Sequence, residues 1–540
     1  MAPPAARLDS VTPPSDRHSH VLLYTSSPWR LLVADVGTFL HLLPSIYEIV
    51  WPPWPNTPHD YDELNRKDWR NVWALVIHGL LMIFQLAFCI GVIVALFFPI
   101  WPGAVVAGVW LCIYINDGIC ARTLNSAKPT LVSTKGLGHD EKGKAIDTHP
   151  DEKWIFINGV AVGEHWMQAN IDLLSIVFQR KIQGIRNRTQ GILFDVIEVI
   201  IERTLDYCTT DVRNAYDELA MALRNENKKK VVLILHSQGG VQGGLVVDWL
   251  LDQCSLEELA KLEVYTFGCA ANHFNNPSAL HHVEHYANTN DFVARWGILN
   301  SIHPLHAARS SKWIQWEALM AKMTWRGSSQ IHRKKKTTKE DARSGYQGLI
   351  FELPRRGHLL NQHYLSHLFP LEENEEAKKW HVKTDGSDAL MDMRMRFVNQ
   401  GLESALERRD SMEAQETKDV IRVSDAALPF RPFQWHCEGH PNAGQAPTFQ
   451  TPVEQVDRER DLRFTAGPSS RPGARTSEFE RPEPRRVDTA PPGLLIDTES
   501  AGRHAATGLK LKEMSRLWEY VNGGSPAESP EESRSRCRTL

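Results

Sequence analysis

The stretch VVLILHSQGG, from Val231 to Gly240, joins five consecutive aliphatic residues to His-Ser-Gln-Gly-Gly. The aliphatic run predicts a buried strand. The glycines Gly239 and Gly240 predict a tight turn into a helix, because a close backbone approach requires residues without a Cβ. Ser237 would then lie at the carboxyl end of a strand, where open parallel sheets collect functional groups. Serine and glycine are also ordinary turn residues, so this stretch alone does not establish a function.

The sequence on both sides of this stretch alternates between short apolar strands and helical patterns. Strands are predicted at WIFING (154–159), IQGIRN (182–187), VVLILH (231–236), LEVYTF (262–267), VEHYANTND (283–291) and GLIFELP (348–354). Strands that alternate with helices form a mostly parallel sheet with helices on both faces. The sequence therefore predicts one α/β domain over residues 151–408.

Composition narrows the class of protein. The 540 residues are 42% hydrophobic and carry a formal net charge of −4, which is typical of a globular chain and argues against a nucleic-acid binder. The eight cysteines are far apart and form no C-x-x-C pair. We expect no disulfide framework and a reducing, cytosol-facing environment.

The region before the α/β domain contains the longest apolar segments of the chain. Residues 1–28 predict a disordered N-terminus, and residues 29–51 predict an amphipathic helix that lies on a membrane surface or on the main domain. Val72 to Ile100 contains no Asp, Glu, Lys or Arg, and a second apolar run follows from Ala104 to Ile115. Basic residues flank the two runs and none lies between them, which predicts a transmembrane helical hairpin over 72–119 with both ends in the cytosol.

Two alternatives stay open for this region. The second run is short for a full span, so it is also compatible with a re-entrant or interfacial segment. A buried core hairpin of a soluble protein is the other alternative, although soluble helices rarely lack charges for so long. At the other end of the chain, Pro, Arg, Glu, Ser and Thr dominate after Arg409, which predicts a disordered tail over 409–540 with one short helix at GLKLKEMSRLWEYV.

Ser237 fits the turn written G-x-S-x-G, in which a sharp strand-to-helix connection displays a nucleophilic serine. The elbow residues here are Leu235, His236, Gly239 and Gly240, and Leu235 replaces the first glycine of the pattern. A leucine at that position predicts crowding where the strand and the helix cross. The backbone N–H of Gln238, at the start of the helix, is the expected first oxyanion donor.

A serine nucleophile needs a base and an orienting carboxylate, in the chain order Ser, acid, His. Asp291 follows the predicted strand 283–287, and His358 follows the predicted strand 348–354. We assign these residues as acid and base, with His363 as the runner-up base. Asn158 and Gly159 make the turn after an early strand, and the Val160 N–H is the expected second oxyanion donor.

No metal and no cofactor is expected. The histidines of HHVEH (281–285) have the wrong spacing for one ion, since His281 and His285 would lie roughly 13 Å apart along a strand. The basic run HRKKKTTKEDAR (332–343) predicts a solvated loop, with contact to anionic lipid head groups as the alternative. The sequon NRT at Asn187 would stay unused on a cytosolic face.

Four blocks, LILHSQGG, VYTFGCAANHF, HYANTNDFVARWG and GHLLNQHYLSHLF, resemble those of fungal α/β-hydrolase-fold membrane proteins. They are similar to class 3 lipase (triacylglycerol lipase-type) and serine esterase domain proteins. The resemblance covers roughly Trp154 to Phe369. It implies an α/β-hydrolase fold with Ser237 as nucleophile, Asp291 as acid and His358 as base.

These expectations describe a membrane-anchored serine hydrolase that cleaves a lipid ester, a long-chain acyl ester or a thioester. The alternative is an α/β-hydrolase-fold membrane scaffold with weak or no activity, whose tail recruits partners. A third hypothesis is a soluble enzyme whose apolar hairpin is a lid. The expected partners are an acyl-ester substrate and a membrane, and no nucleic acid.

Overall fold

The computed structural model describes residues 28–54, 60–98, 101–125, 127–138, 146–275, 279–302, 346–374, 379–384, 390–393, 395–397, 421–425 and 510–526. The predicted disordered N-terminus, the basic run at 332–343 and most of the predicted tail lie outside these residues.

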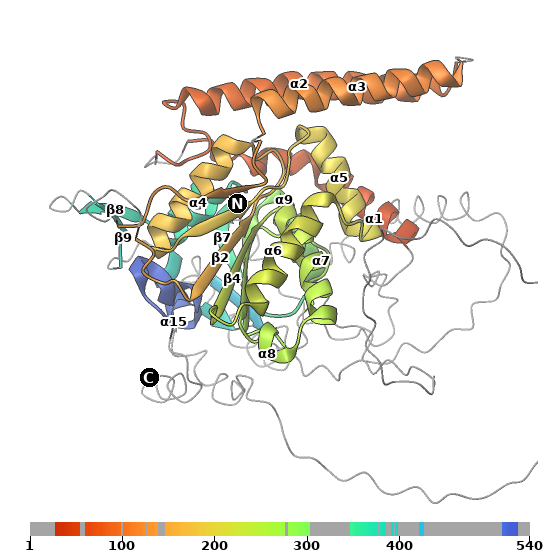
Figure 1. Ribbon diagram of the computed structural model, residues 1–540. Helices are drawn as coiled ribbons and strands as arrows, with labels where there is room; N and C mark the ends of the chain where they lie inside the picture. Colours follow the sequence, from red (N-terminus) through yellow and green to blue (C-terminus); the bar gives the residue numbers. More distant parts are fainter. Residues whose placement is uncertain are drawn as a thin grey trace, which may run out of the picture. The chain divides into compact units, whose positions relative to one another are not determined.

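The described residues form a nine-stranded sheet in the order β1-β3-β2-β4-β5-β6-β7-β11-β10 (Figure 1). The six strands from β3 to β7 in this order are parallel, whereas β1 and β11 pair antiparallel at the two ends. The strands are β1 (Thr130–Val132), β2 (Glu152–Ile157), β3 (Ile182–Ile185), β4 (Lys230–His236), β5 (Leu262–Phe267), β6 (His282–Asn290), β7 (Leu349–Arg356), β10 (Met395–Phe397) and β11 (Ile421–Asp425). The predicted mostly parallel α/β sheet is confirmed.

Helices cover both faces of this sheet (Figure 1). The helices that precede or follow its strands are α4 (Glu164–Phe178), α5 (Ile192–Leu205), α6 (Thr210–Arg224), α7 (Gln238–Gln253), α8 (Leu256–Leu259), α9 (Phe292–Trp296), α10 (Ile298–Ile302), the π-helical turn η4 (Leu360–Leu365), α12 (Ser366–Leu368) and η5 (Leu390–Asp392). A separate two-stranded ribbon pairs β8 (Leu371–Asn374) with β9 (Lys379–Val382).

Strand β4 explains how the sheet divides the core into two layers. Val231, Leu233 and Leu235 pack with residues of α6 and α7, whereas Val232 and Ile234 pack with residues of α4 and η4 on the opposite face. All five side chains are fully buried. A strand that is apolar at every position is buried on both faces, as expected for the centre of a parallel sheet.

The predicted amphipathic helix at 29–51 is α1 (Pro28–Leu42), continued by the 3-10 helix η1 (Leu43–Ile49). Its inner face packs on the domain through Asp35, whose carboxylate receives the guanidinium of Arg203 at 2.8 Å. The Phe39 ring contacts Phe292 and Trp296 edge-on, at centroid distances of 5.3 and 5.4 Å. Its outer face exposes large apolar side chains, namely Trp29, Leu40, Leu43, Ile46, Tyr47 and Val50.

The predicted hairpin consists of α2 (Trp69–Ala95) and α3 (Pro102–Thr123), which lie side by side (Figure 1). In the described residues three segments, Leu31–Ile49, Trp69–Ala95 and Pro102–Thr123, are long and apolar enough to cross a membrane. The second helix is therefore longer than the apolar run 104–115 indicated. It continues through Asn116 and Asp117 to Thr123.

The predicted domain limits, 151–408, are too narrow, and one segment of the predicted tail, 409–540, belongs to the domain. The short helix predicted at GLKLKEMSRLWEYV lies in that segment and is confirmed. Strand β1 joins the sheet before residue 151, and β11 joins it after residue 408. The segment 510–526 forms α15 (Leu511–Met514) and the 3-10 helix η6 (Leu517–Gly523), and it packs on the domain.

The segment 510–526 packs on the domain because it contains a small set of apolar side chains among polar ones. Leu511, Leu517 and Tyr520 are fully buried against the sheet. The Arg516 guanidinium lies 2.9 Å from the buried carboxylate of Glu263, which also accepts a hydrogen bond from the Tyr520 hydroxyl at 2.7 Å. Arg516 therefore meets an opposite charge inside the domain instead of water.

Candidate active site

Ser237 occupies the turn between β4 and α7 in a conformation that L-residues rarely adopt. Its φ and ψ are 58° and −122°. Such a backbone costs about 1–3 kcal/mol and persists where the surroundings hold it. Here the Ser237 N–H donates to the Phe267 carbonyl at 3.1 Å, and the Ser237 carbonyl accepts from the Ala270 N–H at 3.1 Å. A serine held this way at a strand-to-helix turn has the geometry of a nucleophile elbow.

The structure accommodates Leu235 without the expected crowding. A Cβ placed on Gly243 would lie 2.3 Å from Leu235 Cδ1, so the space for the leucine comes from a glycine one turn into α7. A Cβ on Gly239 would lie 2.4 Å from the Ile157 carbonyl oxygen, and this glycine lets the start of α7 approach β2. The replaced glycine of the pattern is thus compensated by a glycine elsewhere.

Asp291 and His358 meet at the carboxyl ends of β6 and β7. His358 Nδ1 lies 2.8 Å from Asp291 Oδ2, and Asp291 is fully buried. The same carboxylate accepts from the Tyr364 hydroxyl at 2.7 Å and, on Oδ1, from the Val293 N–H at 2.8 Å. A buried carboxylate that accepts from Nδ1–H leaves Nε2 of the imidazole as the proton acceptor.

Phe267 and Gly268, at the end of β5, connect the serine to this pair. The Phe267 carbonyl accepts from Ser237, and a Cβ on Gly268 would lie 2.8 Å from Asp291 Oδ2 and 2.9 Å from His358 Nδ1. Gly268 also has a φ of 55°, which L-residues with a Cβ rarely adopt. Both the lack of space for a Cβ and the backbone conformation therefore require a glycine there. The chain therefore holds Ser237 on one side of this turn and the His358–Asp291 pair on the other.

His236, the neighbour of Ser237, makes a second connection. Its ring stacks on that of His358 at a centroid distance of 4.7 Å, and its Nε2 lies 2.8 Å from the His358 carbonyl. Burial, and then the nearby His358, lower the pKa of His236 well below its usual value, so this ring stays neutral. Among the described residues, His358 Nε2 has no hydrogen-bond partner, including Ser237. Hydrogen bonds of this kind often tighten only when substrate binds.

His363, the runner-up base, is engaged elsewhere. Its Nδ1 accepts from the Leu359 N–H at 3.1 Å, and its Nε2 lies 2.9 Å from the Pro52 carbonyl. Burial lowers its pKa to about 4. Both ring nitrogens are therefore occupied, which favours His358 as the base.

The loop after β2 brings a main-chain segment to the serine. A Cβ on Gly159 would lie 3.0 Å from Ser237 Oγ, and Val160 follows directly. Asn158 fixes the loop, since its Oδ1 accepts from the Asn187 N–H at 2.8 Å. Val160 thus lies on a segment that approaches Ser237, and Gln238 directly follows Ser237 in the chain. Their role as oxyanion donors stays a prediction.

A buried polar network behind the elbow was not predicted from the sequence. The Gln238 side chain receives a hydrogen bond from Asn187 Nδ2 and donates to Glu202, both at 2.8 Å. Gln242 also donates to Glu202, at 2.9 Å. Burial raises the pKa of Glu202 to about 7, despite these hydrogen bonds. Asn187 is buried in this network, so the sequon NRT offers no accessible acceptor.

No sequence motif identifies Tyr364 or the residues of this network. The polar residues of the network come from the loop after β3, from α5 and from α7, and only the fold brings them together. The comparisons give no further guide, since no family model and no curated protein sequence matches this chain. The functional argument therefore depends on the residues of the site.

Proposed function

We propose that the chain is a membrane-anchored serine hydrolase of the α/β-hydrolase type. Its substrate would be a carboxylic ester or thioester with a long acyl chain. The observation that carries the proposal is the positive φ of Ser237 at the β4–α7 turn, opposite the buried His358–Asp291 pair across Gly268. This combination of strained serine, histidine and carboxylate is the arrangement that acyl-transfer chemistry requires.

In the proposed reaction Ser237 Oγ attacks the acyl carbonyl carbon, and His358 Nε2 accepts the hydroxyl proton. The N–H groups of Gln238 and Val160 would stabilise the oxyanion. His358 then returns the proton to the leaving alcohol or thiol, which leaves an acyl-enzyme. Water, deprotonated by the same histidine, releases the fatty acid and restores Ser237. Asp291 stabilises the imidazolium in both steps, and no cofactor is needed.

The substrate class is inferred from the apolar surface near the site. The segment that follows α1 contacts the loop of the base, because the Ile49 carbonyl accepts from the His358 N–H at 3.0 Å. This segment exposes Tyr47, Val50 and Trp51, and α5 exposes Ile197, Ile201 and Leu205. Groups of exposed apolar side chains such as these six mark a contact with lipid or protein. A site beside such a surface favours a lipid ester over a water-soluble one. The basic flanks of the hairpin support an orientation with the domain in the cytosol.

Hydrolysis of p-nitrophenyl esters of increasing chain length by the full chain in phosphatidylcholine nanodiscs tests the proposal. We expect turnover that increases from acetate to long-chain esters and that disappears in Ser237→Ala. Equal turnover by wild type and Ser237→Ala would contradict it.

One observation favours a second candidate, a membrane scaffold without activity. Ser237 is only 3% exposed, and no hydrogen bond joins it to His358 in the described residues. A folded wild-type protein without esterase activity on any chain length would support the scaffold.

A further inference from the structure

We infer that the α2–α3 hairpin is monotopic: it enters a single phospholipid leaflet, and its tip stays in the hydrocarbon. Length and composition alone would allow both helices to cross a bilayer. The contacts that each helix makes with the α/β domain leave too little of it for a crossing. This inference does not depend on the proposed function.

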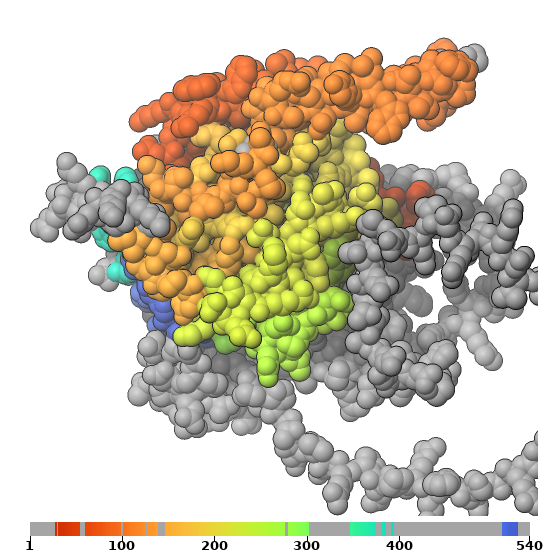
Figure 2. Space-filling view, viewed as in Figure 1, coloured from red at the N-terminus to blue at the C-terminus, as the bar shows by residue number. Residues whose placement is uncertain are grey.

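The first half of α2 lies against the domain instead of lipid. Residues at helical spacing on one face of α2 are buried: Asn71, Ala74, Ile77, His78, Leu81 and Gln85. The Asn71 carboxamide oxygen accepts from Trp166 Nε1 at 2.8 Å, and the His78 ring stacks on Trp166 at 5.7 Å. In the space-filling view the orange surface of the hairpin continues directly into the yellow surface of α4 and α5 (Figure 2).

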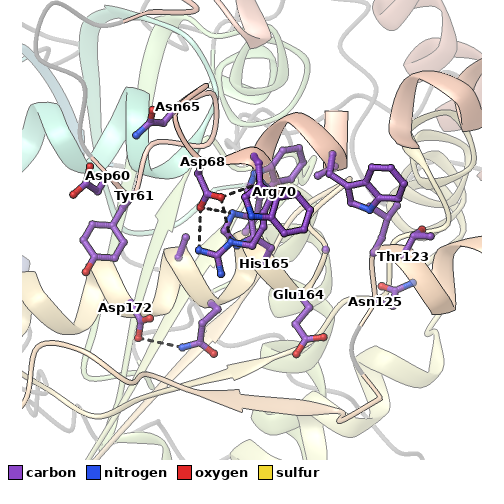
Figure 3. A pocket seen from close by; sticks show the side chains of 18 of the residues that line it. Asp60, Tyr61, Asn65, Asp68, Arg70, Thr123, Asn125, Glu164, His165 and Asp172 are labelled. Atoms are coloured by element: carbon purple, nitrogen blue, oxygen red, sulfur yellow. Dashed lines mark hydrogen bonds and ion pairs between the residues drawn. The ribbon is translucent and has the colours of Figure 1, made fainter. Parts of the chain in front are cut away.

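A cleft of about 1180 Å³, lined by both charged and aromatic side chains, adjoins the start of α2 and the end of α3 (Figure 3). Its lining includes charged side chains from both helix ends and from α4, among them Lys67, Asp68, Arg70, Arg122, Glu164 and Asp172. The same cleft is bordered by Trp69 and Trp73, which are 71% and 48% exposed. Charged groups beside exposed tryptophans are typical of head-group depth, not of the hydrocarbon core.

The middle of the hairpin is tied to the domain by buried amides. Gln85 donates to Asn116 Oδ1 at 2.9 Å and to the Gln190 carbonyl at 2.6 Å, and Asn116 donates to the same carbonyl at 2.9 Å. Gln85 Oε1 accepts from the Leu193 N–H at 3.2 Å. Gly191 permits this contact, since a Cβ there would lie 2.5 Å from Gln85 Nε2.

Charged residues lie at the same level. Gln190 Nε2 donates to Asp117 Oδ1 at 3.1 Å, and Arg188 lies 3.6 Å from the same oxygen. The Asp117 and Arg188 side chains are 48% and 41% exposed. Placing them at the centre of a bilayer would be costly, because exposed charges are not tolerated in hydrocarbon. The Gln85–Asn116 level therefore lies outside the hydrocarbon core.

Only the part beyond this level is free to insert. It comprises Leu86 to Ala95 in α2 and Pro102 to Ile115 in α3. At 1.5 Å per residue these segments are about 15 and 21 Å long, whereas the hydrocarbon core is about 30 Å thick. Neither segment is long enough to cross the core, so the hairpin does not span a bilayer.

The sequence of the tip agrees with this depth. The connection LFFPIWPG, Leu96 to Gly103, contains no charged residue, and its only polar side-chain atom is the indole nitrogen of Trp101. Leu96, Phe97 and Trp101 are 77%, 81% and 75% exposed, and no domain residue covers them among those described. A loop that emerged into water on the far side would leave these three large apolar side chains in water, which is unfavourable. This apolar tip is instead suited to hydrocarbon.

The test compares two lipid surfaces: phosphatidylcholine vesicles and triolein droplets coated with a phosphatidylcholine monolayer. A monotopic hairpin needs only one leaflet, so the full wild-type chain should float with both. The variant Phe97→Arg/Trp101→Arg places two charges at the tip, and it should bind each surface at least tenfold less. The control Leu256→Arg changes a 73% exposed residue of α8 and should bind as wild type does.

Two results would overturn the inference. One is a wild-type chain that binds vesicles but not monolayer-coated droplets. The other is a tip variant that binds vesicles as well as wild type, since charges in a far-side loop would be in water. Thermal unfolding of each variant separates a lost membrane contact from a lost fold, because the substituted residues Phe97 and Trp101 are 81% and 75% exposed.

Discussion

Asp291 accepts hydrogen bonds from three donors, and together they keep His358 in one tautomer. The His358 ring, the Tyr364 hydroxyl and the Val293 N–H share its two oxygens. Asp291→Asn would retain the shape but favour the wrong tautomer of His358. We expect esterase kcat to fall on the order of 10⁴-fold.

A matched control exists for this substitution. Asp248 lies 3.5 Å from the His273 ring and outside the site, so Asp248→Asn should change kcat by less than about twofold. Steady-state kinetics on a long-chain p-nitrophenyl ester measure both. Equal losses in the two variants would contradict the role given to Asp291.

A substitution at Tyr364 perturbs the Asp291 carboxylate less than Asp291→Asn does. Tyr364→Phe removes the donor to Asp291 Oδ2 and leaves the ring packing in place. A hydrogen bond to a charged group contributes about 1.5–3 kcal/mol, so kcat should fall about 10- to 100-fold. KM should stay unchanged, because Tyr364 would not touch the substrate. A change in KM alone would argue against this positioning role.

Glu202 predicts a pH dependence of stability. Its pKa is raised from 4.5 to about 7 by burial, so the folded protein keeps a proton that the unfolded chain releases. The contribution of Glu202 to the free energy of unfolding is therefore full below about pH 4.5, is lost as pH rises to about 7, and is absent above it. The loss would amount to at most about 3 kcal/mol. Glu202→Gln removes the titration, so the difference between wild type and variant should follow this curve. A difference that does not vary with pH would contradict it.

Where β4 crosses α7, the large side chain of Leu235 fits only because position 243 is a glycine. Gly243 makes room for Leu235, so Gly243→Ala should cost about 1–3 kcal/mol of unfolding free energy. The double variant with Leu235→Ala should be destabilised by less than the sum of the single changes.

Gly244→Ala is the control for that cycle. Its Cβ would lie 3.7 Å from Phe274, an ordinary contact, so a neutral or stabilising effect of up to about 1 kcal/mol is expected. Chemical denaturation of wild type, the two single variants and the double variant measures the coupling between positions 235 and 243. Strict additivity of Gly243→Ala and Leu235→Ala would contradict the compensation.

The C-terminal segment 510–526 belongs to the folded domain as a whole, and Arg516 is its main electrostatic contact. Burial alone would raise the pKa of Glu263, but Arg516 and Lys230 outweigh it and lower the pKa. Arg516→Ala would leave Glu263 buried without its closest cation, at a cost of about 3–5 kcal/mol.

Arg70→Ala breaks an exposed ion pair with Asp68 and should cost at most about 1 kcal/mol. Calorimetry or denaturant titration compares the two arginine variants. Equal stability of both would mean that segment 510–526 does not contribute to the fold.

The succession of strands along the chain and the strand-end positions of Ser237, Asp291 and His358 could be predicted, because each follows a short strand pattern that ends in turn residues. Tyr364, Glu202 and Arg516 could not be predicted. Tyr364 acts on Asp291, which is 73 residues away, and Glu202 acts on Gln238, which is 36 residues away. Arg516 acts on Glu263, which is 253 residues away. A single sequence contains no signal for such pairs. Strands β1 and β11, which pair antiparallel with β3 and β7, are only three and five residues long, too short for a periodic pattern.

Labelling of the full chain in membranes with a fluorophosphonate probe, for wild type and Ser237→Ala, tests whether Ser237 is an activated nucleophile. We expect that wild type is labelled and that the serine variant is not. A folded wild-type protein that resists labelling, or a variant labelled as strongly as wild type, would contradict the account, and the membrane scaffold would then be the better description.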